Sequence, residues 1–308
     1  MQNWSSFDMR LPPRRKVWSQ IMQWGSHRYK VSLGLNRGKT NKSQAIEDRA
    51  IIQKRRDGSV VMAVFDGVGE CWHGDATLRP QYMVGGRSRV LGDIPGYCLS
   101  SEMIRSYKGL TDSIFSASQS YQDFLRGVGL HPQRKKHQIG GCTFAAVRFT
   151  EKGNLEVATA GDARLLLRGT FPGGGFISSN DLASLNEEFE RAKASYLLHY
   201  GAIDGRRRFN SHYKPEQRNA LANVKYSFFD GDKRCLDIMY KNSFSLAEID
   251  EFFLLTDGAY ECCADDDAFV QMRIETVMRE RGVLGLLSDD DQPTSSEATV
   301  VHVKRLEQ

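Results

Sequence analysis

Three apolar runs along the chain are each followed by a short motif that contains an aspartate. They are Val60–Phe65 before Asp66-Gly67, Leu155–Ala160 before Gly161-Asp162, and Phe252–Leu255 before Thr256-Asp257-Gly258. Apolar runs of this length are typical of strands that are buried on both faces. A glycine beside the acid lets the backbone approach a ligand closely, because it has no Cβ. The pattern therefore predicts three buried strands that each deliver a carboxylate near their carboxyl end.

The same pattern pairs strands into hairpins. Ala50–Gln53 and Val60–Phe65 flank Asp57-Gly58, a residue pair that favours a tight turn. Cys142–Phe149 and Leu155–Ala160 are separated by Lys152-Gly153-Asn154, which predicts a second hairpin. Further strands are predicted at Tyr29–Leu35, Leu165–Leu167 and Ala298–Val303.

Three amphipathic helices are predicted between these strand pairs. They cover about 100–125 (with Met103, Tyr107, Leu110, Ile114 and Tyr121 on one face), 179–200 (closed by Gly201) and 266–287. Strands that pair by hairpins, with helices inserted between the pairs, favour an α+β fold over alternating βαβ units. We expect two packed, mainly antiparallel sheets whose outer faces are covered by helices.

Two segments depart from this pattern. Residues 1–27 have no sustained period, and lysines and arginines accumulate between Asp8 and Glu47 without an acid. We interpret them as a solvated basic extension ahead of a domain over 28–308. A short apolar stripe of Val17, Ile21 and Trp24 keeps open an organelle-targeting or anionic-surface role. Residues 202–235, which include Arg206–Arg208, are predicted to form an irregular flap.

Composition narrows the class of protein. The 308 residues carry a net charge of +4, so nothing calls for a nucleic-acid partner. No segment approaches the roughly 18 uninterrupted apolar residues of a membrane span. The six cysteines include no CxxC pair, which argues against a zinc knuckle or a disulfide framework. We expect a cytoplasmic monomer with reduced thiols.

If the acids at the strand ends converge, they need a cation. Two unit charges about 4 Å apart repel by about 4 kcal/mol at an effective dielectric constant near 20. Oxygen ligands without cysteine or histidine select magnesium or manganese over zinc. Asp66 could bridge two such ions, with the Gly67 carbonyl as a further ligand. A water shared by two ions is a nucleophile suited to phosphate-ester hydrolysis. Taken singly, each of these acids is also compatible with a structural turn.

Five short motifs follow one another along the chain: Glu47-Asp48, Phe65–Gly69, Gly141–Thr143, Gly161–Arg164 and Thr256–Gly258. Their order resembles that of the metal-dependent protein phosphatases of type 2C, the PPM family, over about Tyr29–Leu306. The resemblance implies an α-β-β-α sandwich. It also implies a centre of two magnesium or manganese ions, with a third, weaker one, and hydrolysis of phosphoserine or phosphothreonine in phosphoprotein substrates.

The resemblance also implies roles for particular residues. Asp66 and Asp257 would be catalytic, because they would hold the ions that bind the nucleophilic water. The Gly67 carbonyl would be a further metal ligand, Glu47 would order waters on the metals, and Asp162 would serve the third ion.

Two departures from the family pattern bear on activity. Ser296 stands where the last motif has an acidic metal ligand, so Glu297 or the Asp289–Asp291 run would have to supply it. The family's phosphate-binding arginine is replaced by Ser43, with Lys42 as the nearest substitute, a point charge in place of a bidentate fork. A second interpretation is therefore a pseudophosphatase, which keeps the fold as a regulatory or binding module.

Overall fold

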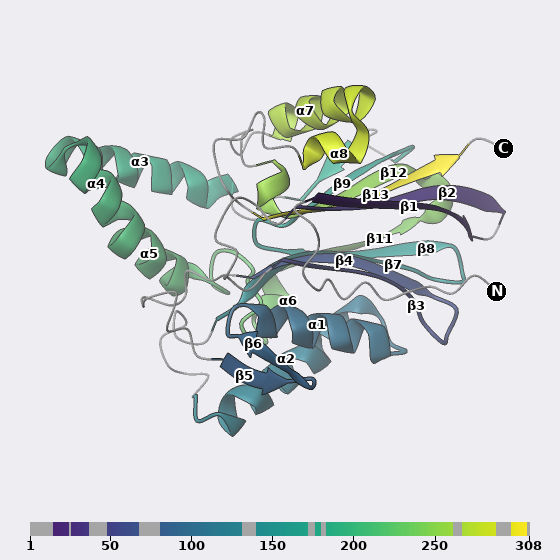
Figure 1. Ribbon diagram of the computed structural model, residues 1–308, viewed down its shortest axis with the longest axis horizontal. Coiled ribbons are helices and arrows are strands. Elements are labelled where there is room, and N and C mark those ends of the chain that lie inside the picture. The colour runs from purple at the N-terminus through teal and green to yellow at the C-terminus, as the bar shows by residue number, and fades with distance from the viewer. Residues whose placement is uncertain are drawn as a thin grey trace.

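Two stacked antiparallel sheets form the centre of the molecule, with helices on the outer face of each (Figure 1). The computed structural model describes residues 15–24, 26–36, 48–67, 81–130, 140–171, 176–179, 183–260, 267–287 and 297–306. The predicted α+β sandwich of mainly antiparallel sheets covered by helices is confirmed.

The first sheet has six strands in the order β1-β2-β13-β12-β9-β10, and all neighbouring strands are antiparallel. The strands are β1 (Arg15–Trp24), β2 (His27–Asn36), β9 (Arg164–Gly169), β10 (Phe176–Ser178), β12 (Ile249–Leu255) and β13 (Ala298–Leu306). The four strands predicted in this sheet, within β2, β9, β12 and β13, are confirmed.

The second sheet has five strands in the order β11-β8-β7-β4-β3. The strands are β3 (Arg49–Lys54), β4 (Val60–Gly67), β7 (Cys142–Phe149), β8 (Asn154–Ala160) and β11 (Tyr240–Ser245). Both predicted hairpins are confirmed, and their turns place Gly58 and Gly153 at φ +77°, where glycine is favoured. A separate small hairpin joins β5 (Gln81–Val84) to β6 (Arg87–Val90).

Strand β4 is buried on both faces, as its apolar run predicts. Met62 and Val64 point into the core between the sheets. Val61, Ala63 and Phe65 point the other way and belong to the core under helices α1 (Asp93–Arg105) and α2 (Leu110–Gly127). The strand that ends at the candidate site is therefore held by two separate cores.

The helix predicted over 100–125 is in fact two helices, α1 and α2. The chain leaves the helix at Ser106, whose ψ of 136° is extended. Arg55 supports this break from a distant hairpin, because its guanidinium donates to the carbonyl oxygens of Met103 (2.6 Å) and Lys108 (2.9 Å). Of the predicted apolar face, Tyr107 is 59% exposed, whereas the other four side chains are buried.

The helix predicted over 266–287 is likewise divided, into α7 (Asp267–Glu280) and α8 (Gly282–Leu286). Gly282 has φ +63°, a conformation that interrupts a right-handed helix. Both helices cover the outer face of the six-stranded sheet (Figure 1). Leu286 and Leu287 are among the residues that they bury there.

The expectation of a solvated N-terminal extension was wrong for residues 15–24. They form the edge strand β1, which pairs with β2 along its whole length. Met22 is buried in the central core, and Trp24 stacks on Phe149 with ring centroids 4.5 Å apart. Val17 and Ile21 are 40% and 48% exposed, so the predicted stripe is split between the two faces of a strand. Residues 1–14 lie outside the described part, and where the domain begins stays a prediction.

The prediction of an irregular flap over 202–235 was wrong for residues 202–221, which are helical. They form α4 (Ala202–Arg208), a π-helical turn η4 (Phe209–Tyr213) and α5 (Lys214–Leu221). Together with α3 (Ala183–Tyr200) they make a helical arm, residues 183–221, that projects from the sandwich (Figure 1, left). Helix α3 ends as predicted, at Gly201 with φ +79°. After the arm, the chain returns to the sandwich and forms the short helix α6 (Cys235–Ile238).

The arm is helical because its apolar side chains recur at helical spacing and pack into a small core shared with the segment that follows the arm. That core contains Leu185, Phe189 and Phe209 of the arm and Ala222, Tyr226 and Phe228 of the following segment. Within the described residues, neither the arm nor any other helix is long and apolar enough to cross a membrane.

Candidate functional site

Strands β4 and β8 bring two of the predicted acids to one end of the five-stranded sheet. Both strands run antiparallel to β7, which lies between them, so Asp66 and Asp162 emerge at the same end. Thr143 of β7 pairs in register with Asp66. Gly161 has φ +75°, and a Cβ on it would lie only 2.3 Å from the Thr143 Cγ2. The loop that carries Asp162 therefore packs against the strand that faces Asp66.

The six-stranded sheet contributes the end of β12 and the start of β13. The Thr256 backbone N–H donates to the Thr299 carbonyl oxygen (3.0 Å), and the Thr299 backbone N–H donates to the Thr256 hydroxyl (2.8 Å). Asp257 begins the 3₁₀ turn η6 (Asp257–Ala259). A Cβ on Gly258 would lie 1.8 Å from the Glu297 carbonyl oxygen. This turn and Glu297 are therefore in direct contact.

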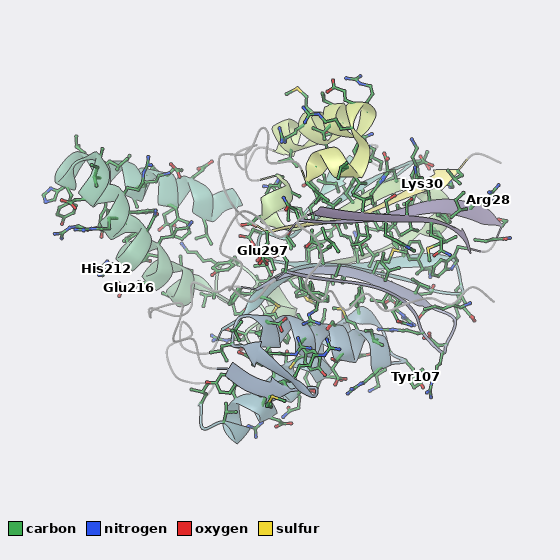
Figure 2. The ribbon with its side chains drawn as sticks, viewed as in Figure 1. Arg28, Lys30, Tyr107, His212, Glu216 and Glu297 are labelled. Carbon is green, nitrogen blue, oxygen red and sulfur yellow. The ribbon has the colours of Figure 1, made fainter. Side chains whose placement is uncertain are left out.

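Asp48 ties these segments to the second sheet. The hydroxyls of Thr256 and Thr299 donate to its Oδ2 at 2.8 and 2.9 Å. Its backbone N–H donates to the Glu297 Oε2 at 2.9 Å. Since Asp48 immediately precedes β3, these bonds link the ends of the two sheets. Figure 2 shows Glu297 between the sheets, on the side from which the arm projects.

The electrostatics of this cluster disfavour negative charge. Burial raises the pKa of Asp48, and the negative charges of Glu297 and Asp257 raise it further. The hydrogen bonds from the Thr256 and Thr299 hydroxyls act in the opposite direction but do not offset this rise. The Asp48 carboxyl is therefore repelled by the carboxyl groups of Glu297 and Asp257 at the mouth between the sheets. A bound cation would relieve that repulsion.

Tyr260 connects the Asp162 loop to the Asp257 turn. Its hydroxyl donates to the Asp162 carbonyl oxygen. Burial raises the pKa of Tyr260, and the negative charges of Asp162 and Asp257 add to the rise. On its other side the ring is covered by the buried Arg164, whose guanidinium carbon lies 4.5 Å from the ring centroid. Both acids therefore lie close to one phenol.

The donor atoms at these strand ends suit a hard divalent cation. Asp162 Oδ1 and Thr143 Oγ1 are buried and have no hydrogen-bond partner among the described residues. Such atoms are rare in folded proteins unless an ion or a water satisfies them. The neighbouring donors are carboxylate, hydroxyl and carbonyl oxygens, which magnesium and manganese prefer. The types of donor atom present therefore match those that such an ion prefers.

The structure brings together part of the predicted set. Asp66, Gly67 and Asp162 lie at the end of one sheet, and Asp257 and Glu297 at the adjoining end of the other. The remaining predicted positions, Lys42, Ser43, Glu47, Ser296 and Asp289–Asp291, lie outside the described residues. Within the described ranges, no three His, Cys, Asp or Glu side chains are grouped closely enough to hold a metal ion.

Sequence reasoning missed three residues that organise the site: Asp48, Thr143 and Tyr260. Asp48 and Thr143 lie inside the recognised motifs, so their position in a motif was an available signal. Tyr260 follows Asp257-Gly258 by two residues, but its contact with Asp162 spans 98 residues of sequence. No local pattern predicts that contact.

The geometry described above belongs to the PPM-type phosphatase fold. No protein-family model and no curated protein matches the sequence. Solved structures match the fold. They include the serine/threonine phosphatase Stp1 of Staphylococcus aureus, with a TM-score of 0.54 and 13% identity over 93% of this chain and 98% of that one.

Two other bacterial structures give the same result. The serine/threonine phosphatase of S. agalactiae has a TM-score of 0.52 and 15% identity over 90% of this chain and 99% of that one. The catalytic domain of the serine threonine protein phosphatase PstP, solved with 2 manganese ions, has a TM-score of 0.50 and 14% identity over 91% and 99%. At these identities the likeness establishes the fold alone.

Proposed function

We propose that this chain is a metal-dependent serine/threonine protein phosphatase of the PPM type, which hydrolyses phosphoester bonds in phosphoprotein substrates. The observation that carries the proposal is the buried Asp48, whose backbone N–H donates to Glu297 and whose pKa is raised by the charges of Glu297 and Asp257, at the strand ends that also deliver Asp66 and Asp162. A fold that served only as a scaffold would gain nothing from this mutual repulsion.

The proposed metal ligands are Asp66, the Gly67 carbonyl and Asp257, with Glu47 ordering metal-bound waters and Asp162 holding a third ion. Magnesium or manganese, as two ions and a weaker third, would supply an activated water for attack on phosphorus.

Glu297 is proposed to provide the carboxylate that Ser296 lacks. Its Oε2 accepts a hydrogen bond from the Asp48 backbone, and its charge acts on Asp48 together with that of Asp257. These contacts support a role for the Glu297 side chain in the acid cluster. Lys42 is proposed to contact the phosphate.

A pseudophosphatase is the second candidate. The observation that favours it is that no three potential metal ligands are grouped closely among the described residues. A serine at position 296, a neutral and weaker ligand, acts in the same direction. Such a protein would keep the sandwich as a regulatory or binding module.

Manganese-stimulated hydrolysis of a phosphothreonine peptide separates the two candidates. The wild type should be active. Asp66→Asn and Asp257→Asn should each lower the activity by at least about 100-fold, because even the removal of a group that only supports a metal ligand can lower activity by that factor. Asp112→Asn, the same change on an exposed residue of α2, is the matched control and should keep full activity. Absence of wild-type activity, or equal activity in all variants, would exclude the enzyme and leave the binding module.

A further inference from the structure

The helical arm projects from the sandwich and has an exposed end (Figure 1). Helix α3 has 18 residues, which corresponds to a length of about 27 Å. It packs closely against α4, because a Cβ on Gly205 would lie 2.5 Å from the Tyr196 carbonyl oxygen. The arm core around Phe189 and Phe209 fixes the two helices to each other. The turn between them therefore lies at the far end of the arm, away from the sheets (Figure 1).

We call residues 198–208 the arm tip, and every one of them except Gly205 is exposed. Leu198 is 90% exposed and Ile203 is 86% exposed, higher than the other large apolar side chains of the described chain. They flank the turn at Gly201. Single exposed apolar residues are ordinary on a surface. Two aliphatic side chains that are almost fully exposed at the end of a projection would be explained if this end of the arm bound an apolar surface.

Charge is unevenly distributed along the arm. The first half of α3 carries Glu187, Glu188 and Glu190. The tip carries three consecutive arginines, Arg206–Arg208, and a single acid, Asp204. Asp204 is 3.0 Å from the Arg207 guanidinium, an exposed pair that contributes little to stability. The far end of the arm is therefore basic, whereas the first half of α3 carries acids.

We propose that the arm tip binds the surface of an anionic lipid bilayer. Aliphatic side chains at the apex would enter the boundary between headgroups and acyl chains, and the arginines one turn behind would contact lipid phosphates. The two most exposed apolar side chains of the tip, Leu198 and Ile203, are aliphatic, whereas the aromatic Tyr200 is only 42% exposed. A protein interface more often centres on aromatic side chains in a packed, desolvated pocket. The exposed aliphatic side chains at the end of a projection thus favour a membrane surface over an acidic polypeptide, whereas the positive charge suits both.

The test is sedimentation of the full-length protein with vesicles. Binding should occur with equimolar phosphatidylcholine and phosphatidylserine, and should be weak with phosphatidylcholine alone. The double variant Arg206→Gln/Arg207→Gln should lose about 25-fold in affinity, since each basic residue near an anionic surface contributes about fivefold. It leaves Arg208 in place, because the guanidinium of Arg208 lies over the Tyr200 ring at 4.6 Å. Leu198→Ser/Ile203→Ser should also reduce binding.

Matched controls make the same changes elsewhere. Arg28→Gln/Lys30→Gln removes two exposed charges from β2, at the opposite end of the molecule (Figure 2). Met272→Ser/Leu284→Ser removes two half-exposed apolar side chains from α7 and α8. Both control variants should sediment like the wild type, and all four should unfold at the wild-type temperature because the changed residues are exposed.

Several outcomes would overturn the proposal. They are no binding to anionic vesicles, equal binding to neutral vesicles, or equal loss in the tip and control variants. Binding of polyglutamate, lost in the arginine variant, without any vesicle binding would assign the tip to an acidic protein instead. None of these results depends on phosphatase activity, so failure here leaves the proposed function untouched.

Discussion

Substitution of Gly258 by alanine should separate the Asp257 turn from Glu297. The new Cβ would lie 1.8 Å from the Glu297 carbonyl oxygen and 2.8 Å from its carbonyl carbon, both backbone atoms. Relief of this contact requires the two backbones to part by roughly 1.5 Å, and overpacking of this kind typically costs 1 to 3 kcal/mol. The adjacent hydrogen bonds between Thr256 and Thr299 would weaken as well, at about 1 kcal/mol each.

We therefore expect Gly258→Ala to lower the free energy of unfolding by about 3 kcal/mol. The midpoint of thermal unfolding should fall by roughly 5 °C, and manganese-stimulated phosphatase activity should be lost. Circular dichroism melting and a phosphopeptide assay measure the two effects. Gly127→Ala is the matched control, because Gly127 ends α2 with open space around its Cβ position. It should be neutral or slightly stabilising.

The reasoning is refuted if Gly258→Ala unfolds at the wild-type temperature. The two backbones would then have room between them. Loss of stability with full activity would refute the further claim that the contact positions Asp257.

Three further predictions concern the site and its surroundings. Tyr260→Phe removes the hydroxyl that donates to the Asp162 carbonyl oxygen, and should cost about 1 kcal/mol of stability in a denaturant titration and reduce activity. Burial raises the pKa of Glu251, but the hydrogen bond with His302 and nearby positive charges outweigh it, so that the pKa is lowered. The contribution of Glu251 to stability should be complete above its pKa in the unfolded chain, about 4.3, and should be lost as the pH falls through its lower pKa in the folded protein. Glu251→Gln should therefore lower the free energy of unfolding at neutral pH, and the free energies of variant and wild type should converge in acid. Manganese at 100 times its dissociation constant should raise the free energy of unfolding by about 2.7 kcal/mol, and no thermal shift should be seen in Asp257→Asn.

Elements specified by local chemistry were predicted well. The two hairpins depend on turns at Gly58 and Gly153, and the doubly buried strand β4 depends on an unbroken apolar run. Strand β1 was missed because polar and apolar residues between Val17 and Trp24 do not alternate cleanly. The Gly25-Ser26 pair before His27 is a hairpin signal that was available but was given no weight.

Other features depend on partners that are distant in sequence. The break between α1 and α2 is supported by Arg55, a residue of the β3-β4 hairpin. Residues 202–221 of the helical arm were predicted to be irregular because their sequence is polar, whereas Phe209 belongs to a small hydrophobic core with Phe189, Tyr226 and Phe228. Neither the support from Arg55 nor the packing of the arm's aromatic residues can be predicted from a short stretch of sequence.

The candidate site shows the same division. Asp66, Asp162 and Asp257 could be proposed as site residues because each comes shortly after an apolar run. The hydrogen bonds that Asp48 accepts from Thr256 and Thr299 span 208 and 251 residues of sequence, so the central position of Asp48 could not be predicted from spacing.

The position of Asp48 also explains why stability and chemistry are linked at this end of the sandwich. Each sheet carries part of the acid set, and Asp48 joins them through two threonine hydroxyls of the other sheet. A buried carboxylate is costly unless it is paired or fully hydrogen-bonded, and Glu297 and Asp257 add to that cost. A fold selected for stability alone would place an apolar residue here, as it does elsewhere along β3 and β4. Electrostatic repulsion that persists where the described parts of several motifs adjoin is expected of a functional site.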